Sequence, residues 1–408
     1  MSAREDASPV AGPAQGSPAE VFRVFLKLGL TSFGGPIAHL GYFRDELVVR
    51  RKWLDEAGYA DLVALCQFLP GPASSQVGFS LGILRGKGLL GGLAAWFAFT
   101  MPSALILLAF ALGAAAFTGP AAEGFLHGLK LVAVAVVAQA IWGMARNLTP
   151  DKTRAGIALA AVAILVFSSG SFGQIGAIAL GAIAGLWLCR SDTPAVSDHL
   201  SFPVSRRHGV IALALFAVLL VIPPLLASAT GQQAIALFDA FYRSGALVFG
   251  GGHVVLPLLQ AEVVTPGWAT SESFLAGYGL AQAIPGPLFT FAAYLGAVVG
   301  PQPNGIAGAV IALVAVFLPG LLLVYGMLPF WGALRLRPAA QAAMRGANAA
   351  VVGILAAALY SPVWTSAVLS PPDFALVLAG FLLLTVWKAP PWIVVQLLAV
   401  AGTLFPLI

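Results

Sequence analysis

Long apolar stretches are the feature that most constrains how this chain folds. Two of them read "GLLGGLAAWFAFTMPSALILLAFALGAAAF" (88–117) and "GVIALALFAVLLVIPPLLA" (209–227). A helix needs about 20 apolar residues to cross the roughly 30 Å hydrocarbon core of a bilayer. Only 9% of the residues are charged and the mean hydropathy is +0.93, which excludes a soluble protein. The sequence therefore predicts an all-α polytopic membrane protein that lies in the lipid bilayer.

The remaining composition excludes several other classes of site. Cys66 and Cys189 lie far apart in apolar surroundings, so we expect packing residues rather than a disulfide or a CxxC metal site. The net charge of +5 does not indicate nucleic-acid binding, because Lys and Arg lie between hydrophobic segments, as orientation signals do. We expect no metal, no cofactor and no nucleic-acid partner.

The second half of the chain repeats the first. "FLKLGLTSFGGPIAHL" (25–40) aligns with "FYRSGALVFGGGHVVL" (241–256). "WLDEAGYADLVALCQFLPGP" (53–72) aligns with "WATSESFLAGYGLAQAIPGP" (268–287) at nearly the same offset. Such matches in register over most of each half indicate an internal duplication, and a duplicated membrane protein often places its binding site at the repeat interface.

The duplication predicts a domain organisation. We expect a disordered tail without a signal-peptide core (1–20), a first repeat (21–190), a linker with one extra helix (191–230) and a second repeat (231–408). Six hydrophobic segments per repeat plus one connecting helix make the second repeat insert from the opposite side, the inverted arrangement of many transporters. The segments are expected near 22–40, 60–84, 88–117, 125–145, 155–170 and 173–189, and near 236–258, 272–299, 305–330, 341–361, 372–387 and 391–407.

Basic residues refine this topology. Most basic loops fall on one side, which the positive-inside rule assigns to the cytoplasm. The loop "RDELVVRRKWLDE" (44–56) fits only if the first two segments of each repeat are re-entrant, because it would otherwise face outward. The matching loop "QAEVVTPGWAT" (260–270) has no Lys or Arg, as expected of an outward loop. Two broken, non-crossing segments per repeat therefore fit best.

Each repeat carries a Pro-Gly-Pro triplet inside an apolar segment, at 70–72 and 285–287. Proline has no backbone N–H to donate to the hydrogen bonds of a helix, and glycine allows the chain to reverse its direction in a tight turn. Lipid tolerates such irregular backbone only where it is packed in protein or lines a wet cavity. The amides after Pro72 are expected to open a new helix whose N-terminus carries about half a positive charge and binds anions. The hydroxyls of Ser74 and Ser75 add donors.

These breaks have two possible roles, helix packing and substrate binding. A Pro-Gly-Pro triplet can simply kink a helix for packing, and the glycine pairs at 34–35 and 250–251 can serve close helix approach. The occurrence of both triplets at corresponding positions favours a site between the repeats. In the second repeat Leu288, Phe289 and Thr290 give a more apolar version of the same helix end.

Three cations within or beside apolar segments point to an anionic substrate. Lys27 and Arg243 correspond in the two repeats and precede the glycine breaks, and Lys130 begins a later segment. No equally buried acid is evident, although snorkelling to the interface would also explain these cations. The predicted substrate-binding residues are Lys27, Gly34, Gly35, Pro70, Gly71, Pro72, Ser74, Ser75, Gln76, Arg243, Gly250, Gly251, Pro285, Gly286, Pro287 and Thr290.

Three further residues are candidates for proton coupling. His39 and His253 are the imidazoles near the breaks, and Asp61 lies near the start of the first Pro-Gly-Pro segment. Imidazole titrates near neutral pH, which suits proton transfer. A core role for the histidines and a helix N-terminal role for Asp61 explain the same residues without transport.

These residues also carry a resemblance. The stretch 30–106, which begins "LTSFGGPIAHL", resembles the N-terminal half of the two-domain chromate transporter family. "FGGGHVVLPLL" and "QAIPGPLFTFAAYLG" resemble its C-terminal half, so the resemblance covers nearly the whole chain after residue 20. It implies a secondary transporter of the bacterial inner membrane that exports chromate from the cytoplasm and gives chromate resistance, with sulfate as the related oxyanion. Homodimer formation is left open.

Other classes fit less well. The chain has no HExxH, GxSxG or Walker A motif and no acidic metal cluster on an apolar segment, so no enzyme is expected. A structural or receptor-like protein would not need paired helix breaks, and the inverted repeat favours a carrier over a channel. A general oxyanion or sulfate carrier of the same fold remains the main alternative to a chromate exporter.

Overall fold

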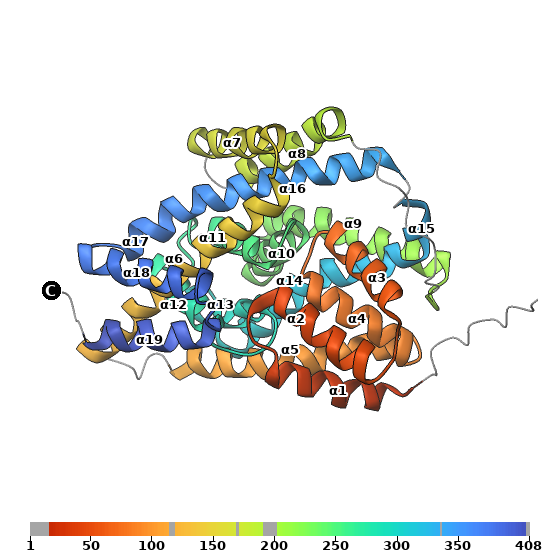
Figure 1. Ribbon diagram of the computed structural model, residues 1–408, viewed down its shortest axis with the longest axis horizontal. Helices are drawn as coiled ribbons and strands as arrows, with labels where there is room; N and C mark the ends of the chain where they lie inside the picture. The colour runs from red at the N-terminus through yellow and green to blue at the C-terminus, as the bar shows by residue number, and fades with distance from the viewer. Residues whose placement is uncertain (1–15, 114–118, 169–170, 191–201, 335–336, 405–408) are drawn as a thin grey trace, which may run out of the picture.

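The computed structural model describes residues 16–113, 119–168, 171–190, 202–334 and 337–404, which form helices and their connections (Figure 1). No strand occurs within these ranges, as the sequence predicts. Residues 1–15 of the expected N-terminal tail lie outside the described residues. The last residues of that segment are helical, because Ser17 caps a helix that begins at Pro18.

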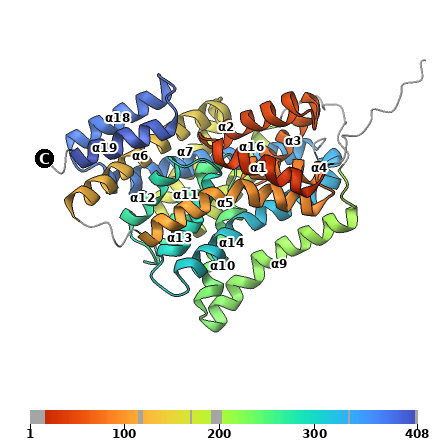
Figure 2. The same ribbon diagram turned by 90° about the horizontal axis from the view of Figure 1, so that it is seen from below.

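Five helices are long and apolar enough to cross a membrane. They are α5 (Leu89–Gly113), α6 (Pro120–Leu148), α9 (Arg206–Thr230), α14 (Gly305–Met327) and α16 (Pro338–Ala358). α9 is the predicted connecting helix and lies along one edge of the molecule, against α10 and α14 (Figure 2). Most of its apolar side chains are exposed, as expected where lipid rather than protein surrounds a helix.

The beginning of the first repeat consists of shorter helices with breaks between them. α1 (Pro18–Thr31) is followed by α2 (Gly35–Phe43) and a π-helix (Arg44–Arg50), and α3 (Glu56–Phe68) is followed by α4 (Ala73–Arg85). A helix of 14 residues such as α1 is about 21 Å long at 1.5 Å per residue. None of these helices alone spans a roughly 30 Å hydrocarbon core.

Both broken segments return to the side from which they start. The rings of Phe25 and Phe43 lie 5.4 Å apart, so the chain after the first break runs back beside α1. Glu20, near the start of α1, pairs with Arg85 at the end of α4, with 3.0 Å between Oε1 and Nη2. These contacts make α1–α2 and α3–α4 hairpins that fold back on themselves, as the interpretation of the basic loop at 44–56 requires.

The second repeat has the same construction. α10 (Gln233–Ala246) is followed by a break and α11 (Val255–Val263), and α12 (Ser271–Ala281) is followed by a break and α13 (Phe291–Val298). The N–H of Gly300, just after α13, donates to the carbonyl of Trp268, just before α12, at 2.8 Å. This second hairpin therefore also returns to its starting side. The short elements are η3 (Gly252–Val254), η4 (Leu288–Thr290), η5 (Leu328–Phe330), α15 (Trp331–Leu334), η6 (Leu359–Trp364) and α17 (Thr365–Ala367).

The two pairs of hairpins start from opposite faces of the molecule. α5 begins beside the end of α4, and further along α5 the ring of Phe110 lies 6.2 Å from Tyr294 of α13. α14 packs along α13 and leads to Trp331, whose ring lies 5.7 Å from Phe68 of α3. The predicted inverted arrangement is therefore present.

Each repeat is completed by helices of the other. α6 of the first repeat packs against α18 (Pro371–Thr385) and α19 (Pro391–Leu404), and α16 packs against α7 (Lys152–Phe167) and α8 (Ser171–Leu188). Both groups are visible in Figures 1 and 2. Glycines meet backbone to backbone at these contacts, as in Gly124 with Gly402, which is how helices approach closely in lipid.

We name the two ends of the molecule by their charge. The basic face carries Arg44, Arg50, Arg51 and Lys52 and the turn after α4 with Lys87. The opposite face carries the connections 231–232, 264–270 and 299–304, which contain no Lys or Arg. The positive-inside rule assigns the basic face to the cytoplasm.

A labelling experiment tests the re-entrant hairpins. With Cys66 and Cys189 replaced by alanine, Val49→Cys should react with an impermeant thiol reagent only in inverted vesicles, because residue 49 is exposed on the basic face, which the positive-inside rule assigns to the cytoplasm. Thr265→Cys on the opposite face is the matched control and should react only in intact cells. Strong labelling of Val49→Cys from outside would contradict the hairpin.

Candidate functional site

The two Pro-Gly-Pro turns are held by reciprocal hydrogen bonds between the repeats. The N–H of Gly71 donates to the carbonyl of Val248 at 2.7 Å, and the N–H of Gly286 donates to the carbonyl of Ser32 at 2.9 Å. Ser32 and Val248 occupy corresponding positions just before the two glycine breaks. The central N–H of each triplet is thus paired with a carbonyl in the broken segment of the other repeat. All four breaks meet at one place, which we call the junction.

Glycine is required at the centre of both triplets. Gly71 has φ +121° and Gly286 has φ +107°, in the region that side chains disfavour. A Cβ at position 71 would lie 2.9 Å from Cα of Gly320, and one at position 286 would lie 2.7 Å from Oγ of Ser103. Gly320 and Ser103 both follow the proline within α14 and α5, so the two contacts are repeat-related as well.

The glycine pairs bring the other two breaks into contact. Gly34, Gly35, Gly250 and Gly251 all have positive φ values, which their turns require. A Cβ at Gly35 would lie 4.0 Å from Nε2 of His253. The predicted glycines of both repeats therefore lie at the junction, where backbone of the first repeat faces backbone and histidine of the second.

The N-terminus of α4 lies at the junction and offers backbone donors. Pro72 caps this helix without a side-chain hydrogen bond, and the first intrahelical bond is donated by the N–H of Gln76 to the carbonyl of Pro72 at 2.9 Å. Helix geometry leaves the N–H groups of Ala73, Ser74 and Ser75 without an acceptor inside the helix. Three amides are therefore available for an anion, because the amide of Gln76 is already paired.

Gln76 has a structural role that the sequence does not reveal. Its side-chain Nε2 donates to the carbonyl of Pro70 at 2.9 Å and to the carbonyl of Gly320 at 3.0 Å. The side chain is fully buried and ties the Pro-Gly-Pro turn to α14 of the other repeat. A contact with substrate through Gln76 stays a prediction.

Several polar groups near the junction are buried without a hydrogen-bond partner among the described residues. Among them are Oγ of Ser75, Oγ of Ser32, Nε2 of His39, Oε1 of Gln76 and Oγ1 of Thr100. Nδ1 of His39 contacts Oγ of Ser74 at 3.4 Å. An unpaired buried polar group costs about 1–3 kcal/mol, so several of them in one region indicate that the region binds a polar ligand or water.

The corresponding helix end of the second repeat is less polar. It consists of η4 followed by α13, and Oγ1 of Thr290 donates to the carbonyl of Pro287 at 2.7 Å. That bond occupies the Thr290 hydroxyl proton, although its oxygen can still accept. The junction is therefore asymmetric, and most of its donors come from the first repeat.

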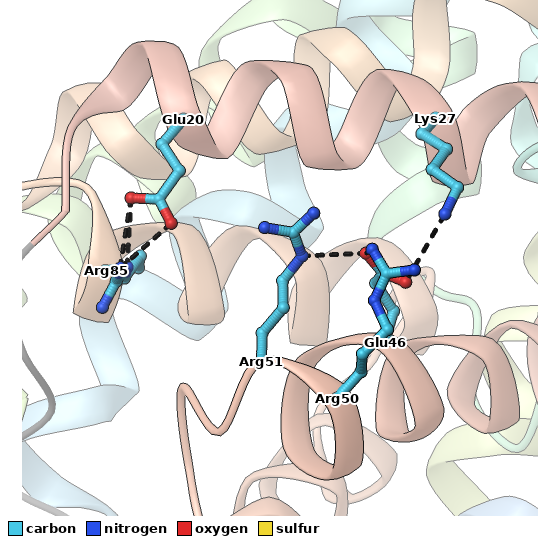
Figure 3. A network of polar contacts seen from close by, with 6 residues as sticks. All are labelled: Glu20, Lys27, Glu46, Arg50, Arg51 and Arg85. Carbon is cyan, nitrogen blue, oxygen red and sulfur yellow. Dashed lines mark hydrogen bonds and ion pairs between the residues drawn. The ribbon is translucent and has the colours of Figure 1, made fainter.

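The repeat-related cations are paired with repeat-related carboxylates. Nζ of Lys27 lies 3.7 Å from Oε2 of Glu46, and Nη2 of Arg243 lies 2.9 Å from Oε2 of Glu262. Figure 3 shows Glu46 between Lys27, Arg50 and Arg51. The expectation that these cations have no equally buried acid was wrong, because the Glu46 and Glu262 side chains are only 10% and 12% exposed.

These ion pairs hold the first hairpin of each repeat closed. Arg243 also binds Asp239 at 2.7 Å, so two carboxylates neutralise it. Glu46 and Glu262 are aligned in the two repeats, at the same separation as Lys27 and Arg243, and this signal in the sequence would have revealed the pairing. Direct contact of Lys27 or Arg243 with substrate stays a prediction.

The three proton-coupling candidates lie in different places. His39 is fully buried beside Ser74, and Nδ1 of His253 lies 2.7 Å from the hydroxyl of Tyr278. Both histidines are at the junction. Asp61 instead lies toward the basic face, where its Oδ1 accepts a hydrogen bond from Nε1 of Trp331 at 3.1 Å.

Comparison with known proteins identifies the family. The sequence model described as "Chromate transporter" matches residues 19–186 and again 235–403, one match for each repeat. The chain belongs to the chromate transporter family. It is 30% identical to the chromate transport protein of Pseudomonas aeruginosa over 97% of this chain and 93% of that protein. It is 28% identical to the probable chromate transport protein of Synechococcus elongatus, over 95% of each chain.

A third relative is the chromate transport protein of Cupriavidus metallidurans, which is 27% identical over 82% of this chain and 80% of that protein. No solved structure matches the chain.

Substituting the central glycines tests the junction. Gly71→Ala or Gly286→Ala should each destabilise the protein by at least about 2 kcal/mol, because a strained φ of about 1–3 kcal/mol is combined with a steric clash. The measurement is the thermal unfolding of the purified protein in detergent. Gly88→Ala is the matched control, since φ is +84° there but no atom lies near its Cβ position, and only the smaller backbone penalty should appear.

Substituting the paired cations separates stability from binding. Arg243→Ala should cost about 2 kcal/mol or more, because it leaves the carboxylates of Asp239 and Glu262 buried and unpaired. Lys27→Ala should cost at most about 1 kcal/mol, since the Lys27 side chain is 54% exposed. Equal losses of stability in both variants would contradict this assignment. Loss of transport in stable Lys27→Ala protein would assign Lys27 to the substrate.

Proposed function

We propose that this protein is a secondary transporter that exports chromate from the cytoplasm across the bacterial inner membrane and thereby gives chromate resistance. The observation that supports this most is the junction, where the serine-bearing N-terminus of α4 meets both repeats of an inverted pair. Transporters with broken helices bind anionic groups at helix N-termini of this kind. Family membership and the names of the curated relatives support chromate as the substrate.

The chemistry of the junction suits a tetrahedral dianion. At neutral pH chromate and sulfate present only acceptor oxygens, so their site must consist of donors. The free amides at the start of α4 and the hydroxyls of Ser74 and Ser75 supply donors, and the helix end supplies partial positive charge. Charge-assisted hydrogen bonds of this type are stronger than neutral ones.

Electrostatics support export as the direction. An inside-negative potential favours the outward movement of each negative charge by about 2.3 kcal/mol per 100 mV, so a dianion gains about twice that. The basic face would also raise the local concentration of anions at the cytoplasmic side. His39 and His253 flank the junction and are the proposed groups for coupling to protons.

A sulfate or general oxyanion carrier is the second candidate. The donors at the junction match any tetrahedral dianion, and none of them distinguishes chromium from sulfur at its centre. The relatives that are named for chromate transport favour chromate.

Transport by inverted membrane vesicles tests both candidates. Energised vesicles should accumulate labelled chromate, and excess sulfate should inhibit only weakly. Ser74→Ala/Ser75→Ala should reduce uptake at least about tenfold, because each lost hydrogen bond to a charged group is worth about 1.5–3 kcal/mol. Ser80→Ala, further along α4 and equally buried, is the matched control and should retain uptake.

Two results would contradict the proposal. If well-folded native protein takes up sulfate but no chromate, the substrate assignment is wrong and the second candidate holds. If the double serine variant transports as fast as the native protein, the start of α4 is not the binding site.

A further inference from the structure

A cavity of about 360 Å³ lies between the junction and the opposite face, and both repeats line it. Phe110 of α5 and Lys130 of α6 come from the first repeat, and Ala276 of α12 and Tyr294 of α13 come from the second. Glu123 and Glu272 also line the cavity and are exposed. Because these two carboxylates are exposed, we place the mouth of the cavity beside them, at the opposite face of the molecule.

About two turns of α5 separate the cavity from the junction. Ser103, which contacts the Gly286 turn, and Phe110, which lines the cavity, both belong to α5. Seven residues of helix correspond to about 10 Å. A tetrahedral oxyanion at the junction would therefore reach the opposite face by moving roughly this distance along α5 and then through the cavity.

Among the described residues that line the cavity, Lys130 is the one lysine or arginine. Its ammonium group forms no ion pair or hydrogen bond with the described residues. His127, one turn earlier on α6, is occupied by Asp373, with 2.7 Å between Nε2 and Oδ1. A cation within a membrane protein is costly unless something pairs with it, so Lys130 is placed to bind an anion that occupies the cavity.

The corresponding place toward the basic face is bridged by side chains. Asp61 aligns with Ala276, and Asn348 aligns with Lys130. Where the cavity has the small Ala276, Asp61 reaches across to Nε1 of Trp331 at 3.1 Å, and the Trp331 ring packs 5.7 Å from Phe68. The two inverted repeats therefore differ at this point, with a cavity on one side and a tryptophan contact on the other.

We propose that the cavity is the outward half of the translocation path, that Lys130 binds the anion within it, and that the Asp61–Trp331 contact is the closed gate on the cytoplasmic side. This inference rests on the proposed oxyanion transport. The structure then corresponds to the outward-open state of an alternating-access cycle, in which the two repeats exchange roles to open the opposite side. The carboxylates of Glu123 and Glu272 at the mouth would repel a dianion returning from outside.

Cysteine labelling tests the cavity independently of transport. In protein with Cys66 and Cys189 replaced by alanine, Ala276→Cys should react with an uncharged, impermeant thiol reagent added to intact cells. Leu275→Cys is the matched control, because residue 275 is on the same helix and equally buried but does not line the cavity. We expect reaction at least tenfold faster at position 276. Equal rates at the two positions would overturn the cavity as a path.

The role of Lys130 is tested by protection and kinetics. Chromate, applied in short pulses that avoid thiol oxidation, should slow the labelling of Ala276→Cys, and Lys130→Gln should abolish this protection. Lys130→Gln should also raise the KM for chromate uptake in inverted vesicles at least tenfold, whereas Lys130→Arg should retain most of the native affinity. Unchanged protection and KM in Lys130→Gln would overturn the role of Lys130.

The gate is tested by Trp331→Phe, which keeps an aromatic ring and removes the N–H that Asp61 accepts. A weaker gate should shift the population toward the inward-open state and slow the labelling of Ala276→Cys from outside several-fold. Unchanged labelling would overturn the gate. If native protein takes up neither chromate nor sulfate while Ala276→Cys still reacts rapidly, the proposed function fails and the cavity stands.

Discussion

Lipid cannot pair with backbone N–H and C=O groups, and the whole architecture depends on this constraint. A helix broken in the middle of a membrane is tolerated only if another part of the protein pairs with the exposed backbone. Here the partner of each Pro-Gly-Pro turn is the broken segment of the other repeat, through Gly71 with Val248 and Gly286 with Ser32. The breaks are thus stable only together, and their meeting point supplies the donors of the proposed anion site.

The ion pairs also hold the first hairpin of each repeat together. Lys27 with Glu46, and Arg243 with Glu262, each connect the two arms of a re-entrant hairpin that is too short to span the membrane. The junction itself consists of amides, hydroxyls and two histidines, which offer hydrogen bonds without a fixed counter-charge to compete with a bound anion.

The sequence predicts the membrane class, the duplication, the inversion and the re-entrant hairpins, because each depends on hydrophobic length, alignment or the placement of Lys and Arg. It also indicates that Gly71 and Gly286 matter, since only glycine suits a reversal between two prolines. It does not show which atoms pair. From the sequence, Gln76 is a candidate substrate-binding residue. In the structure its Nε2 group donates to the carbonyls of Pro70 and Gly320 and so holds the turn to α14. The contact between Asp61 and Trp331 joins residues 270 positions apart that no repeat relation connects.

The reciprocal hydrogen bonds at the junction also bear on how the protein is assembled. The first repeat leaves the ribosome well before the second, so the carbonyl of Ser32 and the amide of Gly71 exist for a time without Gly286 and Val248. During this interval the first repeat has helices but lacks both the closing contacts of its breaks and the helices α18 and α19 that cover α6. The contacts that close the breaks of the first repeat and cover α6 therefore form only after the second repeat has been inserted.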